Sequence, residues 1–141
     1  MMEELSGKLV NPLTGRPATL AMEARPKYVV LYMGAGWCGP CQQFAPKLVK
    51  QLKDKKTAAD DLVTIYLSGD RTPAETKAYL TKLGIEWPTL AFKTRGLMPA
   101  FQSLFGETIP QLVVTDRHGK VLVNSAQVGT ARALQQLANL P

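Results

Sequence analysis

The sequence is poor in metal-binding and cross-linking residues: it has two cysteines and one histidine in 141 residues. Two cysteines exclude a small scaffold held together by several disulfide bonds. A structural zinc site usually has four ligands, and His118, the only further strong ligand, lies far along the chain in a predicted turn. No apolar run approaches the length needed to span a membrane. We therefore expect no metal site and no stable membrane insertion.

Acidic residues are also scarce, with 11 Asp and Glu against 17 Lys and Arg, for a net charge of +6. Lys47, Lys50 and Lys53 share one segment, but the other basic residues are scattered from Arg16 to Arg132. Such a spread is typical of a solvated surface rather than of a nucleic-acid-binding face. We expect no nucleic-acid partner and at most a weak preference for acidic proteins.

Length and a 45% hydrophobic content predict one globular domain, with residues 1–27 as an N-terminal extension and 28–141 as the core. We expect a monomer. The start, Met1-Met2-Glu3-Glu4-Leu5, lacks the basic and apolar regions of a secretory signal, which favours the cytoplasm for the chain as written. The doubled methionine leaves open a trimmed leader and a periplasmic or other extracytoplasmic location.

The first half of the chain alternates between strand and helix patterns. Tyr28–Met33 is a continuous apolar run, typical of a strand buried on both faces, and glycines follow it. Phe44, Leu48 and Leu52 then recur every four residues, which predicts a helix from Cys38 to about Asp54. Leu62–Ser68 is a second buried strand by the same criterion.

The second half contains a capped helix, a hairpin and a last helix. Thr72-Pro73-Ala74-Glu75 fits a capping box and begins a helix that ends at Gly84. Leu97, Phe101, Leu104 and Phe105 form a further short helical stripe. Gln111–Asp116 and Lys120–Asn124 flank a turn, and Thr130 is a candidate cap for a final helix through Leu137. This order predicts an α/β fold with a central mixed sheet and helices on both faces.

Two cysteines three residues apart, Cys38 and Cys41, lie where a buried strand gives way to a helix. The N–H groups and dipole of a helix N-terminus stabilise a thiolate, and in such motifs the thiol pKa falls to about 7 or below. A thiolate is the nucleophile of disulfide exchange. We predict that Cys38 is the exposed attacking residue and that Cys41, one turn deeper, resolves the mixed disulfide. Pro40 fits the first helical turn.

A dinucleotide site is the competing interpretation, because Gly34-Ala35-Gly36-Trp37-Cys38-Gly39 matches G-x-G-x-x-G between a strand and a helix. Asp70 would then contact the ribose. However, Pro40 removes an N–H from the anion-binding turn and Trp37 crowds the pyrophosphate. That interpretation also leaves both cysteines unexplained, so we expect no organic cofactor.

The run Trp37-Cys38-Gly39-Pro40-Cys41 resembles the active site of the thioredoxin superfamily. Pro46 falls where that family has a proline in the active-site helix, and Ile109-Pro110 resembles its cis-proline loop. The resemblance implies a thioredoxin-like fold and a cis Ile109–Pro110 peptide bond. It also implies substrate binding by Trp37, Gly39, Pro40, Ile109 and Pro110.

The tryparedoxin and nucleoredoxin branch is more similar still. The similar segments are Leu5-Ser6-Gly7-Lys8-Leu9, the strand from Tyr28, Ile85-Glu86-Trp87-Pro88 and Leu104-Phe105-Gly106-Glu107-Thr108-Ile109-Pro110. That branch usually has proline where this chain has Gly39. TlpA-like extracytoplasmic reductases share much of the same outline.

Proton transfer departs from the thioredoxin pattern. Thioredoxins carry a buried aspartate six residues before the first cysteine, where this chain has Tyr32. A tyrosine of ordinary pKa, near 10, is not a base at neutral pH. Asp70, at the end of the neighbouring strand, is our candidate for proton transfer with Cys41, although the simpler interpretation is a turn residue before the capping box. Trp87 fits either the rim of the active site or the core.

These features predict a thiol–disulfide oxidoreductase that reduces protein or peptide disulfides and serves cell redox homeostasis. With Gly-Pro between the cysteines, we expect a potential near that of thioredoxin, about −270 mV. The partners would be a disulfide-bearing protein or peptide and a reductase or membrane electron donor. The alternative is a thioredoxin-fold binding module without catalytic activity.

Overall fold

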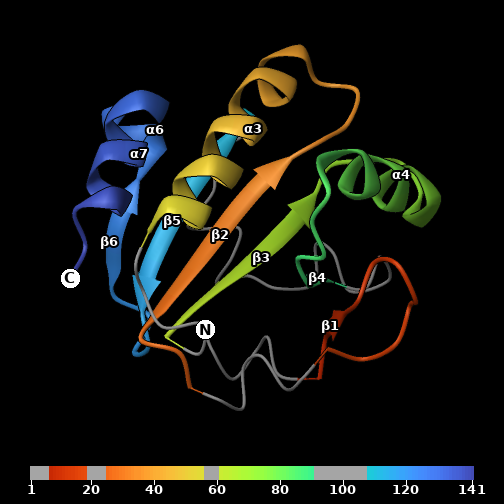
Figure 1. Ribbon diagram of the computed structural model, residues 1–141, viewed down its shortest axis with the longest axis horizontal. Helices are drawn as coiled ribbons and strands as arrows, with labels where there is room; N and C mark the ends of the chain where they lie inside the picture. The colour runs from red at the N-terminus through yellow and green to blue at the C-terminus, as the bar shows by residue number, and fades with distance from the viewer. Residues whose placement is uncertain (1–6, 19–24, 56–60, 91–107) are drawn as a thin grey trace.

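The computed structural model describes residues 7–18, 25–55, 61–90 and 108–141 (Figure 1). The described strands are β1 (Leu9–Val10), β2 (Tyr28–Gly34), β3 (Leu62–Ser68), β4 (Thr89–Leu90), β5 (Gln111–Asp116) and β6 (Val121–Asn124). The described helices are α3 (Gly39–Asp54), α4 (Pro73–Leu83), α6 (Ser125–Val128) and α7 (Thr130–Ala138). The predicted α/β fold, with a mixed sheet flanked by helices, is confirmed.

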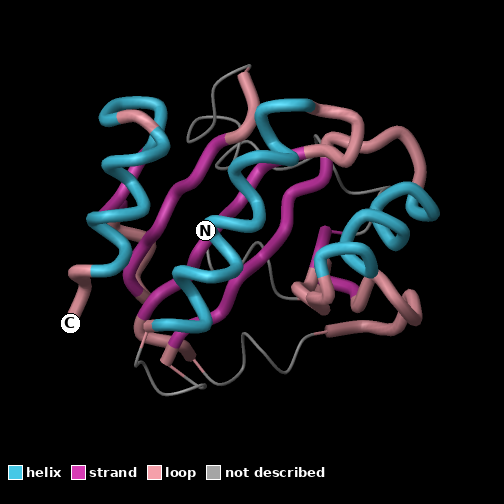
Figure 2. Tube along the Cα trace, turned by 45° about the horizontal axis from the view of Figure 1, so that its top comes forward, coloured by secondary structure: helices cyan, strands magenta, loops and turns pink. Residues whose placement is uncertain are grey.

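The strands form one six-stranded sheet in the order β1-β4-β3-β2-β5-β6. β2 is parallel to β3 over its whole length, from Tyr28 opposite Leu62 to Gly34 opposite Ser68. On its other side β2 is antiparallel to β5. Figure 2 shows β2 in the middle of the sheet, with α3 lying across it. Because β2 and β3 are parallel, their carboxyl ends share one edge of the sheet, and α3 begins at that edge.

Both faces of the central strand are buried, which explains its unbroken apolar sequence. Tyr28, Val30 and Tyr32 belong to a hydrophobic cluster that includes residues of α3, α4 and α7. The alternate residues Val29 and Leu31 belong to a second cluster on the opposite face, together with β3 and Leu9 of β1. The predicted N-terminal extension therefore contributes an edge strand, since β1 pairs with β4.

The start of α4 confirms half of the predicted capping box. The Thr72 hydroxyl accepts a hydrogen bond from the Glu75 N–H at 3.2 Å, so it caps the helix as expected. The Glu75 carboxylate accepts from the N–H of Arg71 rather than from that of Thr72. Gly84 ends the helix in the left-handed conformation, with φ of 73°.

The predicted cap of the last helix is wrong. Thr130 is the first residue of α7, and the cap position belongs to Gly129, which has no side chain to accept a hydrogen bond. The chain reaches α7 through the short helix α6, which begins at the capping residue Asn124. A four-residue helix and the two-residue strands β1 and β4 are too short to show a hydrophobic period. The helical stripe predicted at Leu97–Phe105 lies outside the described residues.

Gly34, the last residue of β2, leaves room for the buried side chain of Tyr32. A Cβ on residue 34 would lie 2.5 Å from the Tyr32 hydroxyl and 2.7 Å from ring atoms of the same side chain. We expect Gly34→Ala to lower the free energy of unfolding by about 1–3 kcal/mol, measured by urea denaturation, because a fully buried ring must move. Gly39→Ala is the control, since nothing lies within 4 Å of a Cβ there. Equal stability of the two variants would contradict this account of Gly34.

Candidate active site

Cys38 and Cys41 lie together at the N-terminus of α3. Cys38 is the N-cap residue, and its sulfur accepts a hydrogen bond from the Cys41 N–H at 3.3 Å. Both cysteines are free thiols. Cys38 is 7% exposed and Cys41 is 0% exposed. The predicted order of accessibility is therefore correct, but the expectation of an exposed Cys38 is wrong, because the protein surrounds most of its side chain.

The environment of Cys41 keeps its thiol protonated at neutral pH. Burial is the largest cause that raises the pKa of Cys41 to about 12, and its interaction with Cys38 adds to the effect. The backbone N–H of Ala35 and the hydroxyl of Tyr32 act in the opposite direction, because both stabilise the thiolate. Cys41 thus needs help to lose its proton before it can act as a nucleophile.

The turn between β2 and α3 is held by side chains on both sides. The Gly36 N–H donates to the Asp70 carboxylate at 2.8 Å, and the Gln42 side-chain amide donates to the Gly36 carbonyl at 2.7 Å. The indole N–H of Trp37 donates to the Gly69 carbonyl at 3.3 Å, while the Trp37 side chain is 61% exposed. These bonds fix the backbone that leads into Cys38 and leave an aromatic surface beside it.

Asp70 lies just past β3, at the predicted edge of the sheet, and is 2% exposed. Besides the Gly36 N–H, its carboxylate accepts hydrogen bonds from the hydroxyls of Ser68 and Thr76 at 2.9 and 3.0 Å. A carboxylate with these donors positions the active-site turn. Its part in proton transfer stays a prediction.

The segment before β5 closes the other side of Cys38. The Ile109–Pro110 peptide bond is cis, as the resemblance implied. The Ile109 carbonyl oxygen lies 3.9 Å from the Cys38 sulfur. The Ile109 side chain packs against a buried cluster of Ala35, Cys38 and Cys41. Of the predicted site residues, Trp37, Gly39, Pro40, Ile109 and Asp70 thus all lie around the start of α3 or the edge of the sheet beside it.

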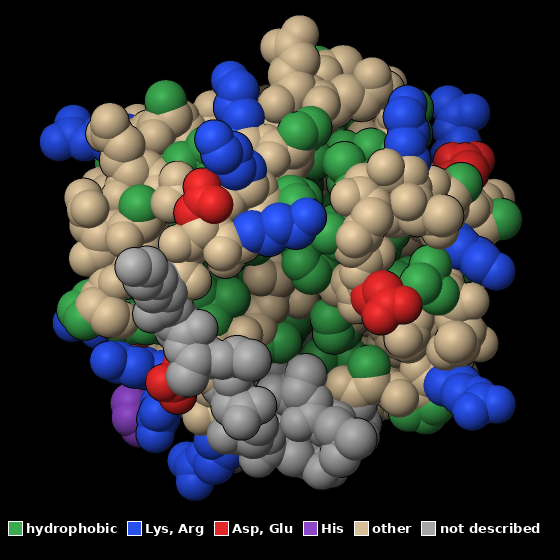
Figure 3. All heavy atoms as spheres, viewed as in Figure 1, with side chains coloured by type: hydrophobic (Ala, Val, Ile, Leu, Met, Phe, Trp, Pro, Cys, Tyr) green, Lys and Arg blue, Asp and Glu red, His purple; other side chains and the backbone are tan. Residues whose placement is uncertain are grey.

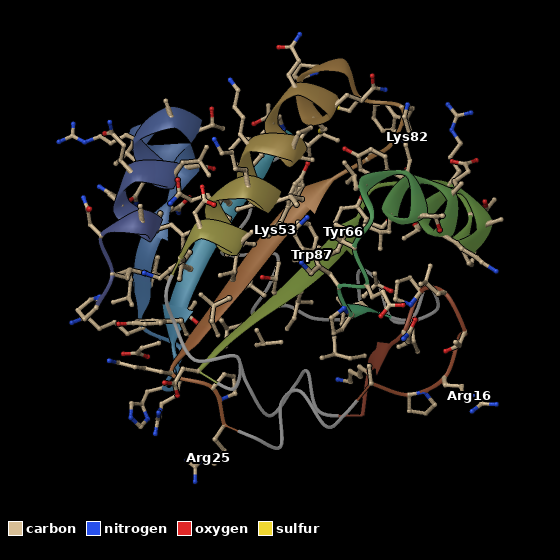
Figure 4. All side chains as sticks on the ribbon, in the orientation of Figure 1. Arg16, Arg25, Lys53, Tyr66, Lys82 and Trp87 are labelled. Carbon is tan, nitrogen blue, oxygen red and sulfur yellow. The ribbon has the colours of Figure 1, made fainter. Side chains whose placement is uncertain are left out.

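An aromatic cluster around Tyr32 forms part of the core. The Tyr32 ring is centred 5.6 Å from Phe44, 5.5 Å from Tyr66 and 6.1 Å from Trp87. Trp87 is partly buried and packs against the core cluster, and Figure 4 shows it beside Tyr66 between α3 and α4.

Sequence reasoning missed Tyr79. Its hydroxyl donates to the Cys41 carbonyl at 3.4 Å, a contact between residues 38 positions apart. The helical spacing of Thr76, Tyr79 and Leu80 indicates an inward-facing side chain, and all three are buried. No sequence signal pairs that side chain with Cys41, since the pairing depends on how α4 packs.

A groove of about 380 Å³ opens beside Trp37, between the start of α3 and α4. It is lined by Gly36, Trp37, Gln42, Asp70, Glu75, Ala78, Tyr79 and Lys82. Elsewhere on the face drawn in Figure 3, the Lys and Arg side chains are spread apart over several elements rather than gathered in one patch. The groove gives solvent a route to Tyr79 from the active-site side of the molecule.

Two other kinds of feature are absent from the described residues. Within residues 7–18, 25–55, 61–90 and 108–141, no group of three or more His, Cys, Asp or Glu is arranged to hold a metal ion. In the same part of the chain, no helix is long and apolar enough to cross a membrane.

The fold and the dithiol at a helix N-terminus define a thioredoxin-like redox protein. A family model described as thioredoxin-like matches residues 26–121. The chain belongs to this oxidoreductase family, and its homologues include nucleoredoxins and tryparedoxins. Its Cys38–Cys41 pair is consistent with the family's CxxC redox centre.

Individual relatives show how far the similarity extends. Probable nucleoredoxin 1 of Arabidopsis thaliana is 34% identical over 76% of this chain, and tryparedoxin of Trypanosoma brucei brucei is 32% identical over 62%. The matched region is 18% of the Arabidopsis protein and 59% of the tryparedoxin. The solved tryparedoxin II of C. fasciculata has a TM-score of 0.71 at 23% identity, covering 93% of this chain and 88% of that one. At this identity, the likeness to the solved structure shows the fold.

The burial of Cys41 predicts a steep pH dependence of its alkylation. In a Cys38→Ser variant, we expect the rate of reaction of Cys41 with iodoacetamide to be low at pH 7. It should rise by about tenfold per pH unit as the thiolate forms, because the raised pKa leaves only the unreactive thiol at neutral pH. The measurement is mass spectrometry of the alkylated protein between pH 6 and 10. A rate that levels off below pH 8 would contradict the raised pKa.

Proposed function

We propose that the protein is a thiol–disulfide oxidoreductase that reduces disulfides of proteins or peptides through Cys38 and Cys41. The observation that carries the proposal is the placement of the pair. The Cys38 sulfur caps α3 and accepts the Cys41 N–H at 3.3 Å, while Cys41 is completely buried behind it. An N–H donor at a helix N-terminus stabilises negative charge on the outer sulfur. The two sulfurs thereby take different roles.

The reaction consists of two exchanges. The Cys38 thiolate attacks one sulfur of the substrate disulfide, forms a mixed disulfide and releases the other half as a thiolate, which takes a proton from water. Cys41 then loses its proton and attacks the Cys38 sulfur. This second attack closes the Cys38–Cys41 disulfide and releases the rest of the substrate as a thiol. Two electrons from a dithiol or reductase donor return the pair to the reduced state.

The surroundings of Cys38 support a polypeptide substrate. Trp37 is 61% exposed, Gly39 and Pro40 are exposed, and Ile109 and Pro110 lie half-buried on the other side of the sulfur. An extended segment that reaches Cys38 would pass between these two sides, with the Ile109 backbone as its hydrogen-bonding partner. A tryparedoxin II has been solved in complex with glutathionylspermidine, which makes small peptide conjugates a second substrate class to test.

The direction of catalysis follows from the residues between the cysteines. A Gly-Pro pair is typical of thioredoxin, whose potential is about −270 mV, so we propose a reductant rather than an oxidant. The electron donor would be a reductase or a membrane-bound donor. Equilibration with a glutathione buffer measures the potential directly.

A trapping experiment tests the two roles. Cys41→Ser leaves Cys38 able to attack but removes the resolving thiol, so we expect a stable mixed disulfide with a disulfide-bonded peptide. Cys38→Ser should give less than a tenth of that adduct at pH 7, because the remaining thiol is buried and protonated. Non-reducing electrophoresis and mass spectrometry identify the linked cysteine. Trapping through Cys41 in the Cys38→Ser variant would reverse the assignment, and trapping in neither variant would contradict the proposed function.

A further inference from the structure

The first turns of α3 carry both cysteines, and their own sequence weakens them. Gly39, the first residue of the helix, loses more backbone entropy on ordering than any other residue type would. Pro46 has no N–H, so the carbonyl of Gln42 lacks the donor that a helix normally supplies four residues later. The helix therefore holds the backbone around Cys41 less firmly than a regular ladder would, and contacts from other elements matter more.

Tyr79 of α4 supplies such contacts at two points. Its hydroxyl donates a hydrogen bond to the Cys41 carbonyl at 3.4 Å, and its side chain is only 8% exposed. Its ring lies against Gly36, because a Cβ on residue 36 would come within 3.2 Å of both Cβ and Cγ of Tyr79. Gly36 precedes Cys38 in the chain, and Cys41 follows it. One side chain thus contacts the active-site segment on both sides of Cys38.

We propose that Tyr79 is a positioning residue, which orients Cys41 for its attack on Cys38 by bonding the Cys41 carbonyl and supporting the Gly36 turn; this rests on the proposed function of the dithiol. In resolution, the Cys41 sulfur must approach the Cys38 sulfur in line with the bond to the substrate. The rate of such an intramolecular step depends strongly on orientation. Tyr79 acts through the backbone of Cys41 rather than through its sulfur.

The helix that carries Tyr79 is itself attached to the active-site turn. Thr76, one turn earlier on α4, is 1% exposed, and its hydroxyl donates to the Asp70 carboxylate at 3.0 Å. The same carboxylate accepts a hydrogen bond from the Gly36 N–H at 2.8 Å. The inner face of α4 therefore reaches Gly36 by two routes, through this carboxylate and through the Tyr79 ring. This double attachment keeps α4 at the distance that the Tyr79 hydroxyl needs to reach Cys41.

Tyr79 acts as a neutral hydrogen-bond donor. Burial is the main cause that raises the pKa of Tyr79 to about 12, so its hydroxyl keeps its proton between pH 6 and 9. A neutral donor holds the Cys41 carbonyl equally well across that range. The factor that Tyr79 contributes to the rate of resolution is therefore independent of pH, although the rate itself rises as the Cys41 thiolate forms.

The test separates attack from resolution in one experiment. Reduced protein is mixed with dithiobis(nitrobenzoate), which releases one coloured thiol when Cys38 attacks and a second when Cys41 closes the protein disulfide. Stopped-flow absorbance times both releases from pH 6 to 9. We expect Tyr79→Phe to slow the second release by about two- to tenfold, the factor that corresponds to the loss of one hydrogen bond. The first release should keep its wild-type rate, and the slowing factor should be the same at every pH.

Gly36→Ala tests the ring contact. The added methyl group would lie within 3.2 Å of two carbon atoms of Tyr79, so the ring must shift and carry its hydroxyl with it. A hydrogen bond of 3.4 Å has little margin to lengthen, and we expect a slower second release. The Gly36→Ala, Tyr79→Phe double variant should be slowed by less than the product of the two single effects, since both changes break the same bond.

Tyr66→Phe is the matched control. Tyr66 belongs to the same buried cluster, with its ring centred 6.3 Å from that of Tyr79. Its hydroxyl has no hydrogen-bond partner among the described residues. Removing that hydroxyl makes the same chemical change in the same cluster without touching Cys41, so both releases should keep their wild-type rates.

Several results would overturn the positioning role. They are a wild-type second release in Tyr79→Phe, slowing of the first release by the same factor, fully multiplied effects in the double variant, or equal slowing in Tyr66→Phe. A slowing factor that changes with pH would also overturn it, because it would indicate proton transfer by the Tyr79 hydroxyl. If the wild-type protein released only one thiol, the proposed function itself would fail, so the two failures are distinguishable.

Discussion

The hydrogen bond between the Gly36 N–H and the buried Asp70 carboxylate connects the two strand ends on which the site depends. β2 and β3 are parallel neighbours, so the turn after one strand lies next to the turn after the other. Asp70 is itself held by Ser68 and Thr76, and therefore couples the active-site turn to β3 and α4. A carboxylate that accepts several hydrogen bonds in a buried site is a rigid anchor. The position of Cys38 at the start of α3 follows from this anchor.

Tyr32, a member of the buried aromatic cluster, stands at the sequence position where thioredoxins have a buried aspartate. Tyr32, Tyr66 and Tyr79 are buried together in the core, and burial raises the pKa of all three. A tyrosine at this position avoids the desolvation cost of a buried carboxylate. It also leaves the Cys41 thiol strongly protonated.

The chain is similar to one part of several larger proteins. The chain spans 18% of the Arabidopsis nucleoredoxin and 23% of mouse nucleoredoxin, so the activities of those whole proteins do not transfer to it. What the chain shares with them is a matched region of 108 and 102 residues, respectively. Gly39 lies exposed between the two cysteines, and the groove lined by Gln42, Glu75 and Lys82 opens beside Trp37.

The sequence by itself determined the elements with a clear period or cap and the identity of the redox pair. The apolar run of β2, the four-residue spacing in α3 and the Thr72 cap are local, because each depends on neighbours within a few residues. The resemblance added the cis peptide before Pro110. The short elements β1, β4 and α6 carry too few residues for a pattern. Only the tertiary structure decided that Cys38 is nearly buried, that Trp87 packs against the core and that Tyr79 reaches Cys41. These facts depend on side chains that meet across 38 or more positions of the chain, and packing rather than local preference brings them together.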